Sequence, residues 1–325
     1  MIKNKKYKSR KLGLILLVLI ATIALLVSTS SATINPDYVS QTMFPGDCFT
    51  ITKTVTIPDY TPTADVVFAF DLTGSMSGII NTAKVQSTNI MNMLITNYPT
   101  VSFNFGVMSY MDYPDTYSSC GYTATYGSSS SGDYAYSLDQ PLTSSTSAVS
   151  TAINGLSLGY GGDGPQDYTR IFYESYADSN VGWRTGAKRL LVNFGDNVPH
   201  DCDLNQGVPG TSGTLSTGKD PGRDEIVNNA DDLDLQSVLA TMASNGVTLL
   251  ECHTTTAYNN YWTYWTGLTG GNVYITSSGT LVNDVVAAIV SGITIPTIAN
   301  LHLAVTTPGY GPWLSSVVPP SYANV

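Results

Sequence analysis

Residues 65–76 have the sequence DVVFAFDLTGSM, and the architecture can be worked out from this segment. Its first half is an uninterrupted apolar run, which is typical of a strand buried on both faces of a sheet. Its second half places Asp71, Thr73 and Ser75 at alternate positions. Because alternate residues of an extended chain point the same way, their oxygens should face one point just past the strand.

On either side of this segment, from Asp65 to Ile293, apolar β-type runs alternate with helical stretches. This pattern predicts an α/β fold, doubly wound, with a mostly parallel six-stranded sheet. The predicted strands are Asp65–Leu72, Val101–Met111, Tyr136–Leu142, Arg189–Gly195, Val247–His253 and Asn272–Ser277. The predicted helices are Met76–Asn97, Ser145–Leu156, Gln166–Ala177, Leu233–Asn245, Tyr261–Leu268 and Leu281–Ser291.

One strand should run against the others. Tyr136–Leu142 follows the Gly-, Ser- and Tyr-rich segment Tyr117–Tyr134, which has no helical period. Because a parallel neighbour would need a crossover helix, we expect Tyr136–Leu142 to be an antiparallel edge strand. The segment before it is expected to be a long surface loop.

Residues 1–32 differ in kind from the rest of the chain. Six Lys and Arg residues precede an apolar run from Leu12 to Val27, which is followed by Ser30-Ser31-Ala32. This order predicts a secretory signal peptide, and the alternative is an uncleaved N-terminal anchor. Both place the rest of the chain outside the cytoplasm, as a secreted or cell-surface protein.

The mature chain is acidic. Without residues 1–32 it keeps 8 basic residues against 24 acidic ones, a net charge of −16. Such a charge disfavours nucleic acid and anionic lipid as partners, and membrane contact is expected only through an uncleaved N-terminal segment. A divalent cation is a better match to clustered acids.

Four cysteines in an exported chain predict disulfides, and no C-x-x-C pair indicates zinc or redox chemistry. Cys202 follows one predicted strand and Cys252 ends the next. We therefore expect Cys202 to pair with Cys252, which leaves Cys48 and Cys120 as the remainder.

Segments of a different type flank the α/β domain, which we place at 64–293. Cys48–Ile57, within residues 33–63, alternates apolar and polar residues with a period of two. Asn300–Val305, within residues 294–325, does the same. Both are predicted to be strands of a β-sandwich that is incomplete in this chain.

Two further loops at predicted strand ends carry oxygen donors. Gly159–Asp167 (GYGGDGPQD) offers Asp163 and Gln166, and Asp196 follows a buried strand. Ligands of open parallel sheets bind at the carboxyl ends of the strands, so these loops should meet Asp71. Carboxylate, hydroxyl and amide oxygens are ligands that suit Mg²⁺, with Mn²⁺ or Ca²⁺ as alternatives.

Taken together, these motifs resemble the metal-ion-dependent adhesion site (MIDAS) of von Willebrand factor A (VWA) domains, in particular the integrin beta-like branch. The resemblance covers about 230 residues and includes D-x-[ST]-G-S-M, G-G-D-G-P and G-D-x-x-P-H in the family's order. Phe105–Asp115 and Gly186–Phe194 also match. It implies a Rossmann-like VWA fold.

The resemblance also implies roles for individual residues. Asp71, Thr73 and Ser75 would bind the metal, and Asp196 would act directly or through water. Gly164 stands where many members have a threonine ligand, and Gln166 where integrin beta subunits have a glutamate. A lower-charge site is therefore expected. Asp112 and Asp163 match part of a second, Ca²⁺-binding site in that branch.

The expected function is metal-dependent adhesion or ligand binding, in which Mg²⁺ captures an acidic group of a partner protein. The alternative is a structural cell-envelope component whose metal site is vestigial or incidental. An enzyme is not expected, because neither His200 nor His253 pairs with a nucleophile. His200 is expected to hydrogen-bond loop backbone near the metal, and Asp201, Asp203 and Asn205 resemble the start of a Ca²⁺ loop.

Overall fold

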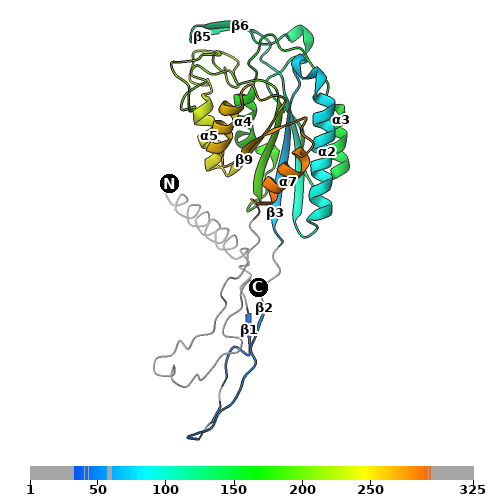
Figure 1. Ribbon diagram of the computed structural model, residues 1–325, viewed down its shortest axis with the longest axis vertical. Helices are drawn as coiled ribbons and strands as arrows, with labels where there is room; N and C mark the ends of the chain where they lie inside the picture. The colour runs from blue at the N-terminus through cyan, green and yellow to red at the C-terminus, as the bar shows by residue number, and fades with distance from the viewer. Residues whose placement is uncertain (1–32, 40, 43, 57–60, 292, 294–325) are drawn as a thin grey trace, which may run out of the picture. The chain divides into compact units, whose positions relative to one another are not determined.

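The computed structural model describes residues 33–39, 41, 42, 44–56, 61–291 and 293 (Figure 1). The chain divides into two compact units, Met1–Tyr60 and Thr61–Val325. The predicted signal segment and the predicted strand Asn300–Val305 lie outside the described residues. Among the described residues, no helix is long and apolar enough to cross a membrane.

The described residues of the first unit contain one small antiparallel pair. Strand β1 (Thr33–Asn35) pairs with β2 (Thr54–Thr56). The predicted strand Cys48–Ile57 is thus shorter than expected, because residues 48–53 form no ladder. A complete flanking sandwich stays a prediction.

The second unit is built on the predicted six-stranded sheet. Its strand order is β10-β9-β8-β3-β4-β7, and all neighbours are parallel except β4 and β7, which are antiparallel. The α/β fold class and the antiparallel edge strand are both confirmed. The strands are β3 (Thr63–Asp71), β4 (Ser102–Tyr110), β7 (Ser137–Thr143), β8 (Lys188–Gly195), β9 (Val247–His253) and β10 (Asn272–Ile275).

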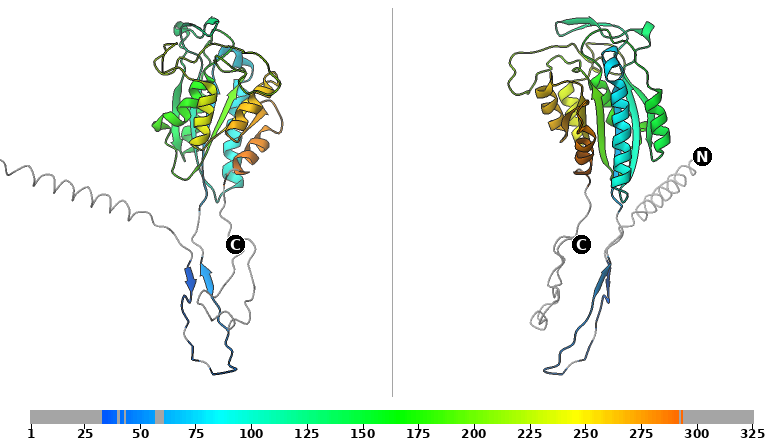
Figure 2. Two further views of the ribbon diagram at one scale, coloured as in Figure 1. Left: turned by 90° about the vertical axis from the view of Figure 1, so that its left-hand side faces the viewer. Right: turned by 45° about the vertical axis from the view of Figure 1, so that its right-hand side comes forward.

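Helices cover both faces of this sheet (Figures 1 and 2). One face carries α2 (Ile80–Asn97), α3 (Thr146–Gly155) and α7 (Leu281–Ser291). The other carries α4 (Tyr168–Ala177), α5 (Leu235–Ser244) and α6 (Asn259–Leu268). Short 3-10 turns are η1 (Gly74–Gly78), η2 (Ser129–Ser131) and η3 (Ser179–Val181).

Strand β3 lies near the middle of the sheet and joins the two cores. Phe68 and Phe70 pack among α2, α3 and α7, whereas Val67 and Ala69 pack among α4, α5 and α6. The chain passes from β3 to β4 on one side and later returns to β8 on the other. The carboxyl end of β3 is therefore a topological switch point, where open α/β sheets bind ligands.

The segment predicted to be a long surface loop contains a β-hairpin instead. Strand β5 (Thr116–Ser119) pairs with β6 (Tyr122–Thr125). Tyr117 and Tyr126 are buried with Tyr113 in a small apolar cluster of their own. Alternating tyrosines thus give this polar segment one buried face, which fixes a hairpin.

The disulfide pairing also differs from the prediction. Cys202 is joined to Cys120, with 5.5 Å between their Cα atoms, and not to Cys252. Cys252 is a free, fully buried thiol on β9, and it packs in the core beside α7. The prediction was wrong because side chains alternate along a strand, and Cys252 points into the core rather than toward the loops.

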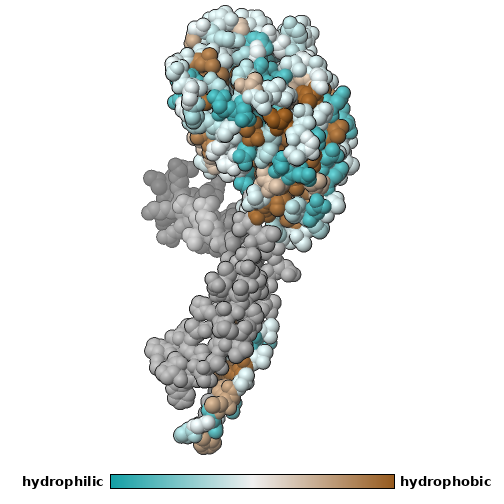
Figure 3. All heavy atoms as spheres, in the orientation of Figure 1, coloured by the Kyte–Doolittle hydropathy of each residue, from teal (hydrophilic) through white to brown (hydrophobic). Residues whose placement is uncertain are grey.

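Hydrophobic residues on the visible face of the second unit are dispersed among hydrophilic ones (Figure 3). The aromatic residues that follow β9 contribute mainly to the core, where Trp262 and Trp265 are completely buried.

Candidate metal centre

The three predicted first-loop residues do come together. Oδ1 of Asp71 accepts hydrogen bonds from the backbone N (2.8 Å) and the hydroxyl (2.7 Å) of Thr73. The hydroxyls of Thr73 and Ser75 are 3.0 Å apart. Asp71 and Thr73 are buried while Ser75 is exposed, so the oxygens lead from the sheet to the surface. The loop thus brings together a buried carboxylate, a buried hydroxyl and one exposed hydroxyl.

Tyr168, the first residue of α4, connects this loop to the loop after β8. Its hydroxyl donates to Oδ2 of Asp71 (3.3 Å) and accepts from the backbone N of Asp196 (2.9 Å) and Asn197 (3.0 Å). A Cβ on Gly195 would lie 2.3 Å from this hydroxyl, so the position requires glycine. One buried phenol therefore fixes Asp71 and Asp196 relative to each other.

The second loop contributes Gln166. Its side chain is buried, its backbone N donates to the carbonyl of Val198 (3.0 Å), and its Oε1 has no hydrogen-bond partner. Gly161 in the same loop packs directly on Thr73, where an added Cβ would lie 3.0 Å from a methyl carbon. The second loop therefore packs on Thr73 through Gly161 and on the loop after β8 through Gln166, whose amide oxygen is left without a partner.

Electrostatics at this site favour a cation. Burial, and then the negative charge of Asp196, raises the pKa of Asp71 to about 7. Burial likewise raises the pKa of Asp196, partly offset by hydrogen bonding from Ser75 and Gln166. Oδ1 of Asp196 is buried without a partner. Two desolvated carboxylates acting on each other are costly, and a divalent ion between them would offset that cost.

The donors fit a hard divalent cation. Asp71, Asp196, Thr73, Ser75 and Gln166 offer only oxygen atoms. Mg²⁺ prefers such ligands and usually keeps several waters, so a shell of few protein oxygens is appropriate. Gln166 supplies a carbonyl without charge, which is consistent with the low-charge site expected from the sequence.

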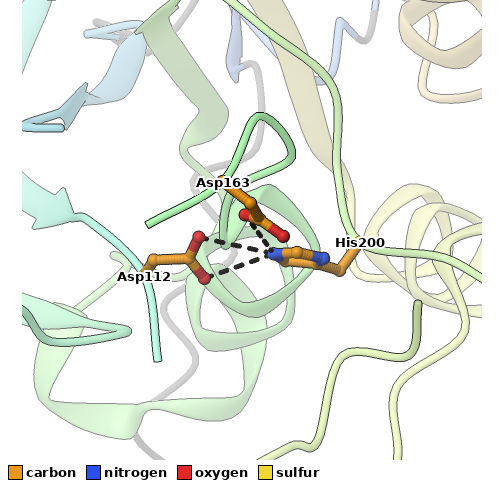
Figure 4. Close-up of side chains that lie close together, drawn as sticks. All are labelled: Asp112, Asp163 and His200. Atoms are coloured by element: carbon orange, nitrogen blue, oxygen red, sulfur yellow. Dashed lines mark hydrogen bonds and ion pairs between the residues drawn. The ribbon is translucent and has the colours of Figure 1, made fainter. Parts of the chain in front are cut away.

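Asp163 belongs to a neighbouring cluster rather than to this group. It lies with Asp112 and His200, and one potential ligand atom from each falls within 4.8 Å of the others (Figure 4). Tyr122 of β6 donates to Oδ2 of Asp163 (2.8 Å). The predicted pair of Asp112 and Asp163 is thus brought together, with an imidazole as a third member.

His200 has the predicted backbone contact and a second one that was not expected. Nδ1 is 2.8 Å from the carbonyl oxygen of Thr217. Nε2 is 3.3 Å from Oδ1 of Asp112 and 3.8 Å from Oδ1 of Asp163. Burial lowers the pKa of His200, which favours the neutral imidazole. His200 is therefore a candidate ligand as well as a loop contact.

In the segment that resembles the start of a Ca²⁺ loop, side-chain oxygens of Asp201 and Asn205 accept hydrogen bonds from backbone N–H groups. Asp201 accepts from the N of Asp203 (2.7 Å) and of Leu235 (2.9 Å). Asn205 Oδ1 accepts from the N of Leu215 (2.8 Å). These side chains stabilise the long loop between β8 and α5.

Sequence reasoning missed two residues of the site region. Tyr168 carried no signal, because a tyrosine at the start of a helix is usually part of the core. Asp167 is fully buried, and both its carboxylate oxygens lack a partner. It ends the predicted GYGGDGPQD loop, so the presence of a second acid in that loop was the available signal.

Comparisons with known proteins add likenesses of fold. No protein-family model and no curated protein matches the chain. Among solved structures, the VWA domain of SpRpn10 is 14% identical, with a TM-score of 0.39, and covers 69% of this chain and 93% of its own.

Two other solved structures are similar to the same extent. The vWF domain of the type V pili tip protein Mfa5 from Porphyromonas gingivalis is 12% identical, with a TM-score of 0.46, and covers 74% of this chain and 99% of its own. Proximal thread matrix protein 1 from the mussel byssus is 11% identical, with a TM-score of 0.40, and covers 72% of this chain and 46% of its own.

Proposed function

We propose that this protein is a VWA-type, metal-dependent binding protein that captures a carboxylate of a partner protein through Mg²⁺. Asp71, Thr73 and Ser75 hold the ion, with Asp196 and Gln166 bound to it directly or through water. The observation that carries the proposal is the convergence of these oxygens from three loops at the switch point of the sheet, two of them buried and unpartnered.

The composition of the shell explains why such an ion would bind a partner. Only Asp71 and Asp196 are charged, so a bound Mg²⁺ is neutralised by no more than two carboxylates and stays electrophilic. Ser75 is exposed, and the ion would therefore be reachable from solvent. A carboxylate from another molecule can then replace a metal-bound water, and the binding becomes a metal-bridged contact.

An extracytoplasmic location is part of the same proposal. The basic, then apolar, N-terminal segment supports it, and so does the Cys120–Cys202 disulfide, since structural disulfides persist in oxidising compartments. The role proposed is binding and not catalysis.

The first test is calorimetric titration of Mg²⁺ into the wild type and Asp71→Asn, an isosteric change that removes one charge. We expect saturable binding that Asp71→Asn reduces at least tenfold. Asp284→Asn, an exposed acid on α7, is the matched control and should titrate like the wild type. Equal heats for all three proteins would contradict the proposal and favour a structural envelope component.

The second test concerns the partner. Immobilised wild type and Asp71→Asn are incubated with the material surrounding the source cells, with Mg²⁺ or with EDTA. Proteins retained only by the wild type in Mg²⁺ are the expected metal-bridged partners. A set of retained proteins that neither EDTA nor Asp71→Asn changes would count against capture through the metal.

A further inference from the structure

The cluster of Asp112, Asp163 and His200 is separate from the Mg²⁺ site and carries its own chemistry. Asp112 follows β4, Asp163 belongs to loop two, and His200 lies in the loop after β8. Asp112 and His200 are completely buried, and 12% of the Asp163 side chain is exposed. Figure 4 shows both carboxylates directed at the same ring nitrogen.

Hydrogen bonding assigns the tautomer of His200. Nδ1 faces a carbonyl oxygen, that of Thr217, which can only accept, so Nδ1 carries the proton. In the neutral ring, Nε2 then presents a lone pair to Asp112 and Asp163. A backbone carbonyl on one ring nitrogen is the usual support of a metal-binding histidine. Stacking on Tyr126, with ring centroids 3.6 Å apart, holds the ring in place.

Asp167 is an independent indication of a missing positive charge. Its carboxylate is completely buried beside that of Asp112, and neither of its oxygens accepts a hydrogen bond from an N–H or hydroxyl group of the described residues. The guanidinium of Arg170, whose charge acts on Asp167, donates instead to Glu174, Tyr113 and the carbonyl of Gly222. Oδ1 of Asp163 is unpartnered too. Three carboxylates and a lone pair thus meet here, and among the described residues no group donates to either oxygen of Asp167 or to Oδ1 of Asp163.

We propose that Asp112, Asp163 and His200 bind a transition-type cation such as Zn²⁺, with Asp167 or water as the fourth ligand. Calcium takes oxygen ligands, whereas zinc binds imidazole and carboxylate together. Zinc ligands about 2.0 Å from the ion lie about 3.3 Å apart in a tetrahedral site. The His200 Nε2 to Asp112 Oδ1 distance is 3.3 Å, and the distance to Asp163 Oδ1 is 3.8 Å.

The imidazole of His200 changes which metal ion this cluster is expected to bind. Asp112 and Asp163 alone matched a Ca²⁺ site, but His200 completes a mixed nitrogen and oxygen set. Such an ion would join β4, loop two and the loop after β8. Through Tyr122 it would also connect to the β5–β6 hairpin. It would therefore stabilise the loops around the Mg²⁺ site without forming part of that site.

The test is a Zn²⁺ titration of the full mature chain in saturating Mg²⁺, which keeps the central site filled. Cys48→Ser is the background, because Cys48 is an exposed free cysteine and cysteine thiolates are zinc ligands. We expect one Zn²⁺ per chain that millimolar Ca²⁺ does not displace. His200→Gln and Asp163→Asn should each weaken binding at least tenfold.

Two control variants show whether the Zn²⁺ is bound at this cluster or elsewhere in the protein. His253→Gln removes a buried imidazole that faces the carbonyl of Asn197 instead of the cluster, and it should keep the Zn²⁺ site. Asp71→Asn should also bind Zn²⁺ like the wild type. The Zn²⁺ result therefore does not depend on whether the central site binds Mg²⁺. Equal Zn²⁺ binding by wild type and His200→Gln would overturn the assignment.

A spectroscopic measurement on the unmutated site covers the case in which a variant fails to fold. X-ray absorption at the zinc edge of the wild-type chain in the Cys48→Ser background should show one imidazole in the first shell. An all-oxygen shell, or a chain that takes up no Zn²⁺ while binding Ca²⁺ there, would overturn the proposal.

Discussion

The hydroxyl of Tyr168 donates a hydrogen bond to Oδ2 of Asp71, and the Tyr168 hydroxyl oxygen accepts hydrogen bonds from the backbone N–H groups of Asp196 and Asn197. The residue touches no solvent and offers the ion nothing directly. Its hydroxyl instead fixes the positions of Asp71 and Asp196 relative to each other. In metal sites, such supporting contacts often affect affinity almost as strongly as the ligands do.

Tyr168→Phe should therefore weaken Mg²⁺ binding by roughly tenfold or more, and should lower the free energy of unfolding by about 1–3 kcal/mol. The physical reason is that the two partly buried N–H groups of Asp196 and Asn197 lose their acceptor while Asp71 loses a donor. Tyr136→Phe is the matched control, because its hydroxyl bonds Asp178, which belongs to neither metal cluster. Calorimetry and denaturant unfolding measure both effects. Equal Mg²⁺ affinities for the two variants would show that Tyr168 only fills space.

The response to pH should reverse when Mg²⁺ is added. Without metal, the pKa of Asp71 is about 7 in the folded chain and about 4 when unfolded. The native state then binds more protons, so stability should fall as pH rises from about 4 to about 7. Bound Mg²⁺ favours the ionised form of Asp71. The apparent affinity of the protein for Mg²⁺ should therefore drop up to tenfold per pH unit below pH 7.

Other buried acids, including Asp112, Asp167 and Glu251, also have raised pKa values and contribute with the same sign. Asp71→Asn isolates the contribution of one residue. The difference in unfolding free energy between the wild type and this variant should depend on pH between 4 and 7. A constant difference over that window, measured without metal, would contradict the assignment to Asp71.

Gln166→Glu should raise Mg²⁺ affinity by roughly tenfold, because it adds a third carboxylate beside Asp71 and Asp196. The same change should destabilise the metal-free protein, since the added charge is buried next to two others. Mg²⁺ titration and thermal unfolding with and without metal check both signs. Gln140→Glu on β7 is the control and should change neither. A variant that is stabilised without metal would show that Gln166 does not face the two acids.

The sheet and the central loop could be predicted from sequence because each depends on local pattern. DVVFAF is apolar at every position but its first, so it predicts a strand buried on both faces. Asp71, Thr73 and Ser75 follow it with alternate spacing, so their convergence needs only an extended chain. The order of the loops along a parallel sheet then placed Asp196 and Gln166 at the same end.

The remaining contacts depend on side-chain directions that one sequence does not reveal. Whether Tyr168 points toward Asp71 is set by how α4 packs on the sheet. His200 was expected to hydrogen-bond loop backbone rather than to bind the metal, because nothing in its own segment shows that Asp112 and Asp163 face its other nitrogen. In the hairpin, polar composition indicated a loop, although alternate tyrosines such as Tyr117 give it a buried face.

The Cys120–Cys202 bond ties the β5–β6 hairpin to the loop after β8, and its removal is the last prediction. The bridge joins residues 82 positions apart in the chain. Because a cross-link of that span restricts the unfolded chain, Cys120→Ser should lower the free energy of unfolding by roughly 2–4 kcal/mol. Cys48→Ser, which changes an exposed free thiol, is the control and should have little effect.

The same substitution should loosen the second metal cluster more than the central site. Tyr122, two residues beyond Cys120, donates to Asp163, whereas Asp71 and Tyr168 lie on β3 and α4. We therefore expect Cys120→Ser to weaken Zn²⁺ binding several-fold and to leave Mg²⁺ binding nearly unchanged. Peptide mapping of the oxidised wild type checks the pairing itself. A Cys202–Cys252 peptide, or equal unfolding energies for the two serine variants, would contradict the bond as described.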